Sequence, residues 1–365
     1  MLIYFLIVVL ILAFSLVYKK LCELDSGNKY FKLYKVICLT AMILTLSIFY
    51  AVRGLSVGTD TKAYNHIFNY LADNFDSSLF HYEIGFTLLS SIIYAMSPSF
   101  TLFMFVVGVI MFSCIIFANY KLSKNPVLSN ILFITFGFYM QSFNIIRQYL
   151  AISFILIGLY FLIKKNNNWL FLLFVLIASL FHKTAVVAGV ILILKYVKFE
   201  TMYVLILSVV MLLGILLLPQ ISNVLETILH TSYFKTYLPL MGDISTTDLL
   251  LVAMAIVCVV VAIILRSYLK KKNKDFDIVH YDMYVWLLTL FCFIKVASIF
   301  TIENIDRLGA YFLIAILFFI PLVIEELFKS RKELWSWIIC VFSVICMVIM
   351  IQVIGVYGAY PYVFI

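Results

Sequence analysis

Charged residues are scarce in this sequence. Only 12% of its 365 residues are charged, whereas an ordinary soluble domain has about a quarter. Hydrophobic residues make up 65% of the chain, so too few polar side chains remain to cover the surface of a water-soluble globule. Glycine and proline are also few, which excludes collagen-like and low-complexity disordered chains. The composition therefore predicts a polytopic membrane protein, with residues 1–365 forming a single integral membrane domain.

The chain also lacks the patterns of metal and disulfide scaffolds. None of its seven cysteines forms a CxxC pair, and most fall within apolar runs, which predicts buried thiols. Four of the five histidines fall in outer loops or at an outer helix end, but their spacing matches no metal-binding motif. We therefore predict no metal site and no cofactor.

Long apolar runs dominate what remains. A helix needs about 20 mostly apolar residues to cross a bilayer. Twelve runs are predicted to be transmembrane helices: residues 2–18, 36–52, 99–118, 127–142, 146–163, 169–182, 185–197, 202–218, 249–265, 281–300, 308–324 and 334–354. A thirteenth run, 84–97, is short, and we expect an interfacial or re-entrant helix there. Ser97 and Pro98 are expected to form the N-cap and first turn of the next span. The predicted fold class is all-α.

The basic residues orient these spans. Nineteen of the 26 lysines and arginines fall on one side if the spans alternate. The positive-inside rule places that side in the cytoplasm, so both termini are predicted to be extracytoplasmic. The excess of lysine and arginine in the cytoplasmic loops accounts for the net charge of +8. We therefore expect no nucleic-acid partner.

The outer side holds a distinctive set of basic residues. Arg53, Arg147 and Arg307 are three of only five arginines, whereas 21 lysines supply most of the cytoplasmic charge. A guanidinium grips phosphate or carboxylate with two parallel hydrogen bonds, which an ammonium cannot do. These arginines therefore indicate an anionic ligand at the outer face. The alternative is that each arginine snorkels from the end of a span to the lipid headgroups.

Two outer loops are large, 53–83 and 219–248. Within the first, residues 62–75 have apolar side chains at helical spacing, which predicts an amphipathic helix. Glu83 stands where an apolar helix begins, so we expect it to be paired, with the nearby arginines as candidate partners.

His182 lies at the outer end of a predicted span. It is either an ordinary interface residue or a functional group. The second loop carries rings and carboxylates that suit sugar binding or belong to an aromatic belt: Tyr233, Tyr237, Asp243 and Asp248.

Five short motifs occur in order over residues 50–312. They are Arg53…Gly58-Thr59-Asp60…Tyr64, Glu83-Ile84-Gly85-Phe86, Asn144-Ile145-Ile146-Arg147-Gln148-Tyr149-Leu150-Ala151, Phe181-His182-Lys183-Thr184-Ala185 and Asn304…Arg307…Tyr311. With these motifs the chain resembles the EpsG family of bacterial exopolysaccharide proteins, related to Wzy-type O-antigen and capsule polymerases. Two positions depart from the family pattern, which often has proline at Ile84 and serine at Thr184.

The resemblance implies a polysaccharide polymerase of the bacterial cytoplasmic membrane, with a GT-C-like architecture as one option. Such an enzyme would transfer a growing glycan from undecaprenyl diphosphate onto a lipid-linked oligosaccharide repeat unit at the outer face. Its expected partners are that lipid-linked substrate, membrane lipid, a chain-length regulator and other polysaccharide assembly proteins. A ligase with another acceptor and a flippase-like transporter of lipid-linked glycans remain alternatives.

This chemistry assigns expected roles to the outer residues. A diphosphate leaving group needs positive charge, and an acceptor hydroxyl needs a base. Imidazole titrates near neutral pH, whereas a carboxylate does so only when apolar surroundings raise its pKa. The expected diphosphate ligands are Arg147 and Arg307, with Arg53 either assisting them or pairing with Asp60. The candidates for the base are His182 or Glu83, then Asp60. Substrate contacts are expected from Tyr64, Gln148 and Tyr311.

Overall fold

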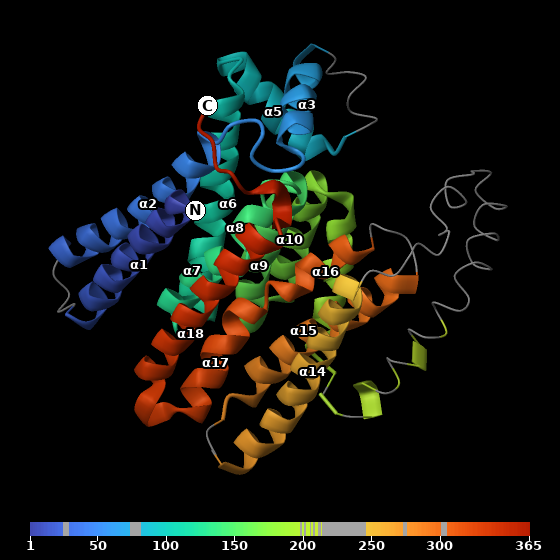
Figure 1. The fold of residues 1–365 in the computed structure, drawn as a ribbon. Helices are drawn as coiled ribbons and strands as arrows, with labels where there is room; N and C mark the ends of the chain where they lie inside the picture. The colour runs from blue at the N-terminus through green and yellow to red at the C-terminus, as the bar shows by residue number, and fades with distance from the viewer. Residues whose placement is uncertain are drawn as a thin grey trace. The chain divides into compact units, whose positions relative to one another are not determined.

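The computed structural model describes residues 1–24, 29–73, 82–197, 199–200, 202–204, 206, 209–210, 213, 246–272, 276–300 and 305–365. Within these ranges the secondary structure is helical, apart from one isolated β-bridge between Arg53 and Phe364. The all-α prediction is therefore confirmed. Contacts divide the chain into two compact units, one formed by Met1–Gly189 with Ile320–Ile365 and the other by Val190–Phe319 (Figure 1).

The first unit contains most of the helices. Its longer helices are α1 Leu2–Glu23, α2 Lys29–Ala51, α3 Thr61–Asp73, α5 Ile84–Met96, α6 Phe100–Leu122, α7 Pro126–Thr135, α9 Ile146–Lys164, α10 Asn168–Phe181 and α18 Lys332–Val348. Shorter elements complete it: α8 Phe138–Gln141, η1 Lys183–Gly189, η2 Lys329–Arg331, the π-helical turn η3 Ile349–Val353, and η4 Val356–Gly358.

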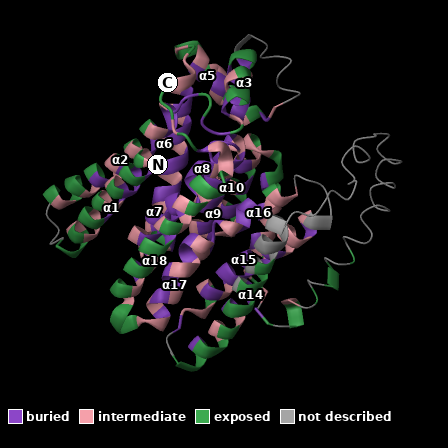
Figure 2. Cartoon of the chain, in the orientation of Figure 1, coloured by how far each residue is buried: buried purple, intermediate pink, exposed green. Residues whose placement is uncertain are grey.

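Helix α9 forms the centre of this unit. About two-thirds (67%) of its membrane-length window is buried, compared with 17% for the segment Lys329–Val353 that contains α18. Figure 2 shows the same contrast, with buried residues concentrated on α6, α7 and α9 and exposed ones on α1, α2 and α18. A helix that is apolar on all sides and buried by its neighbours is expected inside a membrane bundle. The start of α9, which carries Arg147, is therefore held firmly in place.

Polar side chains connect three of the helices deep in the bundle. The Asn119 amide of α6 donates to Asn130 of α7 at 2.9 Å, and the Asn130 amide donates to Ser15 of α1 at 3.1 Å. All three residues are buried. Without water to compete, such hydrogen bonds contribute to helix association in a bilayer. They fix the position of α1 relative to α6 and α7.

The amphipathic helix predicted at 62–75 is present as α3. Its apolar positions Tyr64, Phe68 and Leu71 are buried, as the helical spacing requires. Phe68 stacks on Phe103 of α6 with ring centroids 4.8 Å apart. This packing holds the polar segment that follows Arg53 against the end of the bundle.

The second unit contains α11 Val190–Leu194, α14 Thr246–Lys272, α15 Ile278–Phe300 and α16 Asp306–Leu313, and its boundary with the first falls within α17 Ile316–Leu327. Arg266 of α14 forms a two-pronged ion pair with Asp282 of α15, at 2.5 and 2.6 Å. The Tyr281 hydroxyl donates to the Ala262 carbonyl at 2.7 Å. These contacts join α14 to α15.

Six described helices are long and apolar enough to cross a membrane, or seven if the bent pair α16 and α17 counts as one span. The protein is therefore an integral membrane protein, but the predicted total of about twelve spans is not shown. The predicted span 202–218 lies mostly outside the described residues. The run 84–97 is a helix of 13 residues, α5, which is too short to cross a bilayer alone. Its depth in the membrane stays a prediction.

Three of the predicted spans are not continuous helices, and one of them, 308–324, is the bent pair α16 and α17. The run 127–142 breaks after α7, because Gly137 adopts a left-handed φ of +85° before α8 begins. The run 185–197 consists of the 3-10 helix η1 followed by the five-residue α11. The helix cap predicted at Ser97 was also wrong. Ser97 ends α5, and Ser99 caps α6 by accepting a hydrogen bond from the Leu102 backbone at 3.3 Å.

Candidate functional site

Glu83 is the centre of a polar cluster formed by three helix ends of the first unit. It precedes α5 and is only 7% exposed. One carboxylate oxygen accepts a hydrogen bond from the Arg147 guanidinium at 2.5 Å. The other lies 3.2 Å from Nδ1 of His182 and accepts from the Lys183 backbone N–H at 3.3 Å. We call Glu83, Arg147 and His182 the carboxylate cluster.

A glycine allows these helix ends to meet. A side chain at Gly85, in the first turn of α5, would place its Cβ 2.8 Å from the Leu180 carbonyl oxygen of α10. Such a distance is too short for carbon and oxygen, so any larger residue would push the two helices apart. Helix α10 ends just beyond this contact, and its C-cap residue His182 has extended backbone angles. The close approach therefore brings His182 within reach of Glu83.

Aromatic rings surround the Arg147 guanidinium. Its central carbon lies 5.6 Å from the ring centroid of Tyr82 and 5.9 Å from that of Phe86, both within the range of cation–π attraction. Tyr64 of α3 also hydrogen-bonds to Arg147, and its ring lies 6.1 Å from that of Phe86. The side chains of Arg147 and His182 remain 25% and 23% exposed. Both groups are thus held by the protein yet partly open to a ligand.

The cluster keeps Glu83 ionised. Burial raises the pKa of the Glu83 carboxyl, but the hydrogen bond from His182 and the positive charge of Arg147 outweigh burial and lower the pKa to about 2. For Tyr64 the net shift has the opposite sign. Burial raises the pKa of its hydroxyl more than Arg147 lowers it. At neutral pH the site therefore contains a carboxylate, a guanidinium and a neutral phenol.

Arg53 lies in a different environment. It is 2% exposed, and its guanidinium lies against the rings of Tyr50 and Phe143, with its central carbon 4.1 and 4.4 Å from their centroids. One nitrogen donates to the Tyr50 carbonyl. No ion pair with Asp60 occurs among the described residues, where the Asp60 carboxylate instead accepts from the Thr59 hydroxyl at 2.9 Å. Asp60 also begins α3, with its carbonyl accepting from the Tyr64 backbone at 3.0 Å.

Residues 355–365 form a strap over the loop that follows Arg53, and the sequence patterns gave no sign of it. The Gly54 N–H donates to Val363 O at 2.6 Å, and the Ile365 N–H donates to Val52 O at 3.0 Å. The Tyr4 hydroxyl of α1 donates to Ala359 O at 2.6 Å. These are mainly backbone contacts, so no side-chain pattern could predict them.

Asn144 connects this strap to the cluster. Its side-chain oxygen accepts from the Thr59 backbone N–H at 2.9 Å, and its amide donates to Tyr357 O at 3.0 Å. Asn144 lies three residues before Arg147, in the turn that leads into α9. The strap and the Gly58-Thr59-Asp60 motif therefore both act on the turn that positions Arg147.

The remaining predicted site residues lie apart from these contacts or outside the described residues. Gln148 of α9 is 2% exposed, within the bundle. In the second unit, Arg307 is exposed near the start of α16 and Tyr311 is 1% exposed. His81, His230, Tyr233, Tyr237 and Asp243 fall outside the described residues, as does the side chain of Asp248. Across the described ranges, no three His, Cys, Asp or Glu side chains gather as they would around a metal ion.

Comparison with protein families matches residues 36–364 to the EpsG family. The chain belongs to this family. EpsG proteins are membrane proteins implicated in exopolysaccharide biosynthesis, and the match includes the carboxylate cluster and nearly all of the strap. Searches among curated proteins and among solved structures found no match.

Proposed function

We propose that this EpsG-family protein is a polysaccharide polymerase acting on lipid-linked oligosaccharides at the outer face of the bacterial cytoplasmic membrane. An acceptor sugar hydroxyl attacks the anomeric carbon of the growing glycan, and the bond from that carbon to undecaprenyl diphosphate breaks. The hydroxyl proton passes to a base, and the diphosphate leaves with the electron pair. The observation that supports this proposal most directly is the carboxylate cluster, which combines a candidate base with a candidate diphosphate ligand.

His182 is the better candidate for the base. Its Nδ1 lies 3.2 Å from the Glu83 carboxylate, so Nε2 is left to accept a proton from the acceptor. Glu83 itself is a weak base because its pKa is lowered to about 2. We therefore assign Glu83 to a positioning role, in which it orients the His182 ring and stabilises the imidazolium that forms during transfer.

Arg147 is the candidate ligand of the leaving diphosphate. Glu83 holds one guanidinium nitrogen, and the side chain is partly exposed at the start of α9. A guanidinium fixed before the reaction stabilises developing phosphate charge without reorganisation. Arg307 is a second candidate ligand of the diphosphate, because it belongs to one of the family motifs and its side chain is exposed. The buried position of Arg53 supports a structural contribution instead of direct contact with the diphosphate.

Reconstitution tests the proposal. The purified chain is mixed with its lipid-linked repeat unit in detergent, and the glycan products are separated on a gel. Wild-type protein should give a ladder of longer glycans. His182→Gln should reduce the rate by about 10²–10⁴-fold, the usual contribution of a general base. Arg147→Lys, which keeps the charge but loses the planar fork, should reduce it about 100-fold.

His66→Gln provides the matched control, because His66 is exposed on α3, a helix that contributes Tyr64 to the surroundings of Arg147. It should leave the ladder unchanged. Unaltered transfer by both His182→Gln and Arg147→Lys would remove their assigned roles. Wild-type protein that binds the lipid-linked unit and leaves it unchanged would overturn the polymerase proposal in favour of a transporter.

A further inference from the structure

A cavity of about 400 Å³ opens at the far end of the first unit from the carboxylate cluster. Tyr4, near the start of α1, contacts the strap, whereas Tyr18, Lys19 and Glu23 at the end of α1 line the cavity. The 22 residues of α1 span about 33 Å at 1.5 Å per residue, roughly the thickness of a bilayer. The cavity therefore lies at the opposite membrane surface, on the side predicted to be cytoplasmic.

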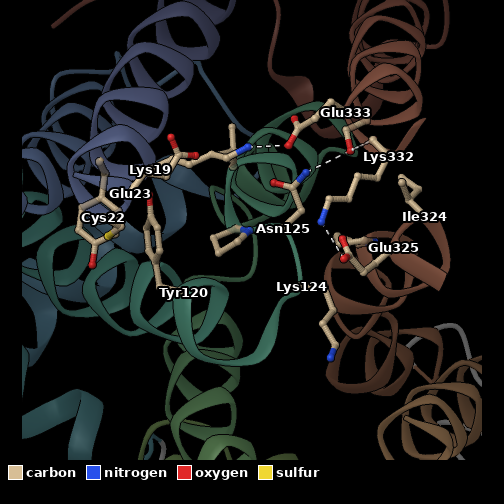
Figure 3. A pocket seen from close by; sticks show the side chains of 15 residues that line it. Lys19, Cys22, Glu23, Tyr120, Lys124, Asn125, Ile324, Glu325, Lys332 and Glu333 are labelled. Carbon is tan, nitrogen blue, oxygen red and sulfur yellow. Dashed lines mark hydrogen bonds and ion pairs between the residues drawn. The ribbon is translucent and has the colours of Figure 1, made fainter. Parts of the chain in front are cut away.

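Positive and negative side chains balance in this cavity. It is lined by three lysines and three glutamates: Lys19, Lys124, Lys332, Glu23, Glu325 and Glu333. Figure 3 shows two ion pairs among them, Lys19–Glu333 at 2.7 Å and Lys332–Glu325 at 2.8 Å. Their side chains are between 32% and 61% exposed. Partly exposed ion pairs contribute little stability, so a ligand with charges of both signs can replace them.

A shallow apolar groove continues from this cavity into the membrane. A second cavity, of only about 30 Å³, shares Lys19, Asn125, Val127, Glu333 and Ser336 with the first. Its other walls are apolar: Leu12, Leu16, Leu128, Ile131, Trp337 and Cys340. Leu12 lies seven residues before Lys19 on α1, which is about 10 Å deeper in the bilayer. A charged site thus adjoins a shallow apolar groove between α1, α7 and α18.

We propose that this cavity and groove bind a phospholipid whose headgroup carries both a phosphate and an ammonium, of the phosphatidylethanolamine type. The phosphate pairs with Lys19 and Lys332, and the ammonium pairs with Glu325 and Glu333. One acyl chain lies along this shallow groove on the surface of the bundle. If a headgroup with negative charge alone paired with Lys19 and Lys332, their present partners Glu333 and Glu325 would lose those lysines and gain no cation in return. A water-soluble zwitterion would leave the groove uncovered. The charge balance and the groove together therefore select this lipid class, independently of the polymerase proposal.

Native mass spectrometry of the purified full chain tests this site. Three lipids with identical acyl chains are added at equal concentration: phosphatidylethanolamine, phosphatidylglycerol, and phosphatidylethanolamine with an acetylated amine. We expect about tenfold stronger retention of the first lipid, equivalent to about 1.4 kcal/mol. Lys332→Gln with Glu325→Gln should abolish this preference, because it removes one ion pair without leaving a lone charge. Lys121→Gln should preserve it, since Lys121 is exposed at the end of α6 but does not line the cavity.

The groove is tested by filling it. Leu16→Trp should lower the retention of all three lipids, whereas Val17→Trp should not, because only Leu16 lines the groove although both residues are exposed. Stronger retention of phosphatidylglycerol would replace the proposal with an anionic-lipid site. Equal retention of the three lipids by wild-type protein, or equal effects of the two tryptophan variants, would overturn it. The thermal unfolding temperature of each variant without added lipid verifies that it is folded.

Discussion

Arg53 and Arg147 both stand at helix ends on one side of the first unit, yet their surroundings differ. Two aromatic rings and a backbone carbonyl enclose Arg53, and its side chain is almost fully buried. Arg147 instead pairs with the Glu83 carboxylate and keeps a quarter of its side chain exposed. The same residue type thus serves one region as a structural anchor and the other as part of a charged site.

The difference follows from what each guanidinium can still bind. Arg53 has no room for a substrate, and the strap lies across the loop that follows it. Arg147 is held by one carboxylate oxygen, while the second oxygen of the same carboxylate faces His182. A charge that a protein fixes and leaves partly open is suited to chemistry, whereas a fully enclosed guanidinium can act only on its own neighbours in the fold. Stability and activity should therefore separate at these two residues.

The largest expected effect on stability is at Arg53. Arg53→Met removes two cation–π contacts and the hydrogen bond to the Tyr50 carbonyl, which should destabilise the protein by about 2–4 kcal/mol. Thermal unfolding in detergent measures this change, and transfer per folded molecule should fall much less than in Arg147→Lys. An unchanged unfolding temperature, combined with the same loss of transfer as Arg147→Lys, would show that the two arginines do not differ as described.

A smaller effect is expected where α5 approaches α10. Gly85→Ala places a methyl group against the Leu180 carbonyl oxygen, so the helices must separate, at a cost of about 1–3 kcal/mol. The same movement lengthens the contact between Glu83 and His182, and transfer should fall as well. Gly189→Ala is the matched control, because a Cβ at Gly189 meets no atom within 4 Å. Equal unfolding temperatures for the two variants would contradict the close-approach argument.

The candidate site was partly predictable from the sequence. Glu83, Arg147 and His182 each stand out as polar residues at the end of an apolar run, and the pairing of Glu83 with a nearby arginine is present in the structure. That Arg147 is the partner could not be predicted, because the contact depends on how α5, α9 and α10 pack. The enclosure of Arg53 could not be predicted either, because its partners are the aromatic rings of Tyr50 and Phe143, which are far apart in the sequence.

The fold shows the same limit. Hydropathy correctly predicted apolar helices, but it does not register where a backbone breaks. The run 127–142 is mostly apolar, yet it contains Gly137, whose left-handed backbone separates α7 from α8. The strap is equally hidden, because its bonds to Val52 and Gly54 use backbone atoms that every residue possesses. Within the described residues, composition alone therefore predicts more spans than there are long continuous helices.

The smallest expected effect distinguishes the two regions by pH. The pKa of Glu83 is lowered from 4.5 to about 2 in the folded protein, so its ionised form stabilises the fold. That contribution is fully present above pH 4.5 and is lost as the pH falls toward 2. The difference in unfolding temperature between wild-type protein and Glu83→Gln should therefore be constant near neutral pH and shrink over this acidic range.

The corresponding difference for Arg53→Met should change less, because no carboxylate pairs with Arg53 among the described residues. A difference for Glu83→Gln that widens on acidification would mean that Glu83 is held in its protonated form. Glu83 would then lose its assigned role as the ionised partner of Arg147 and His182.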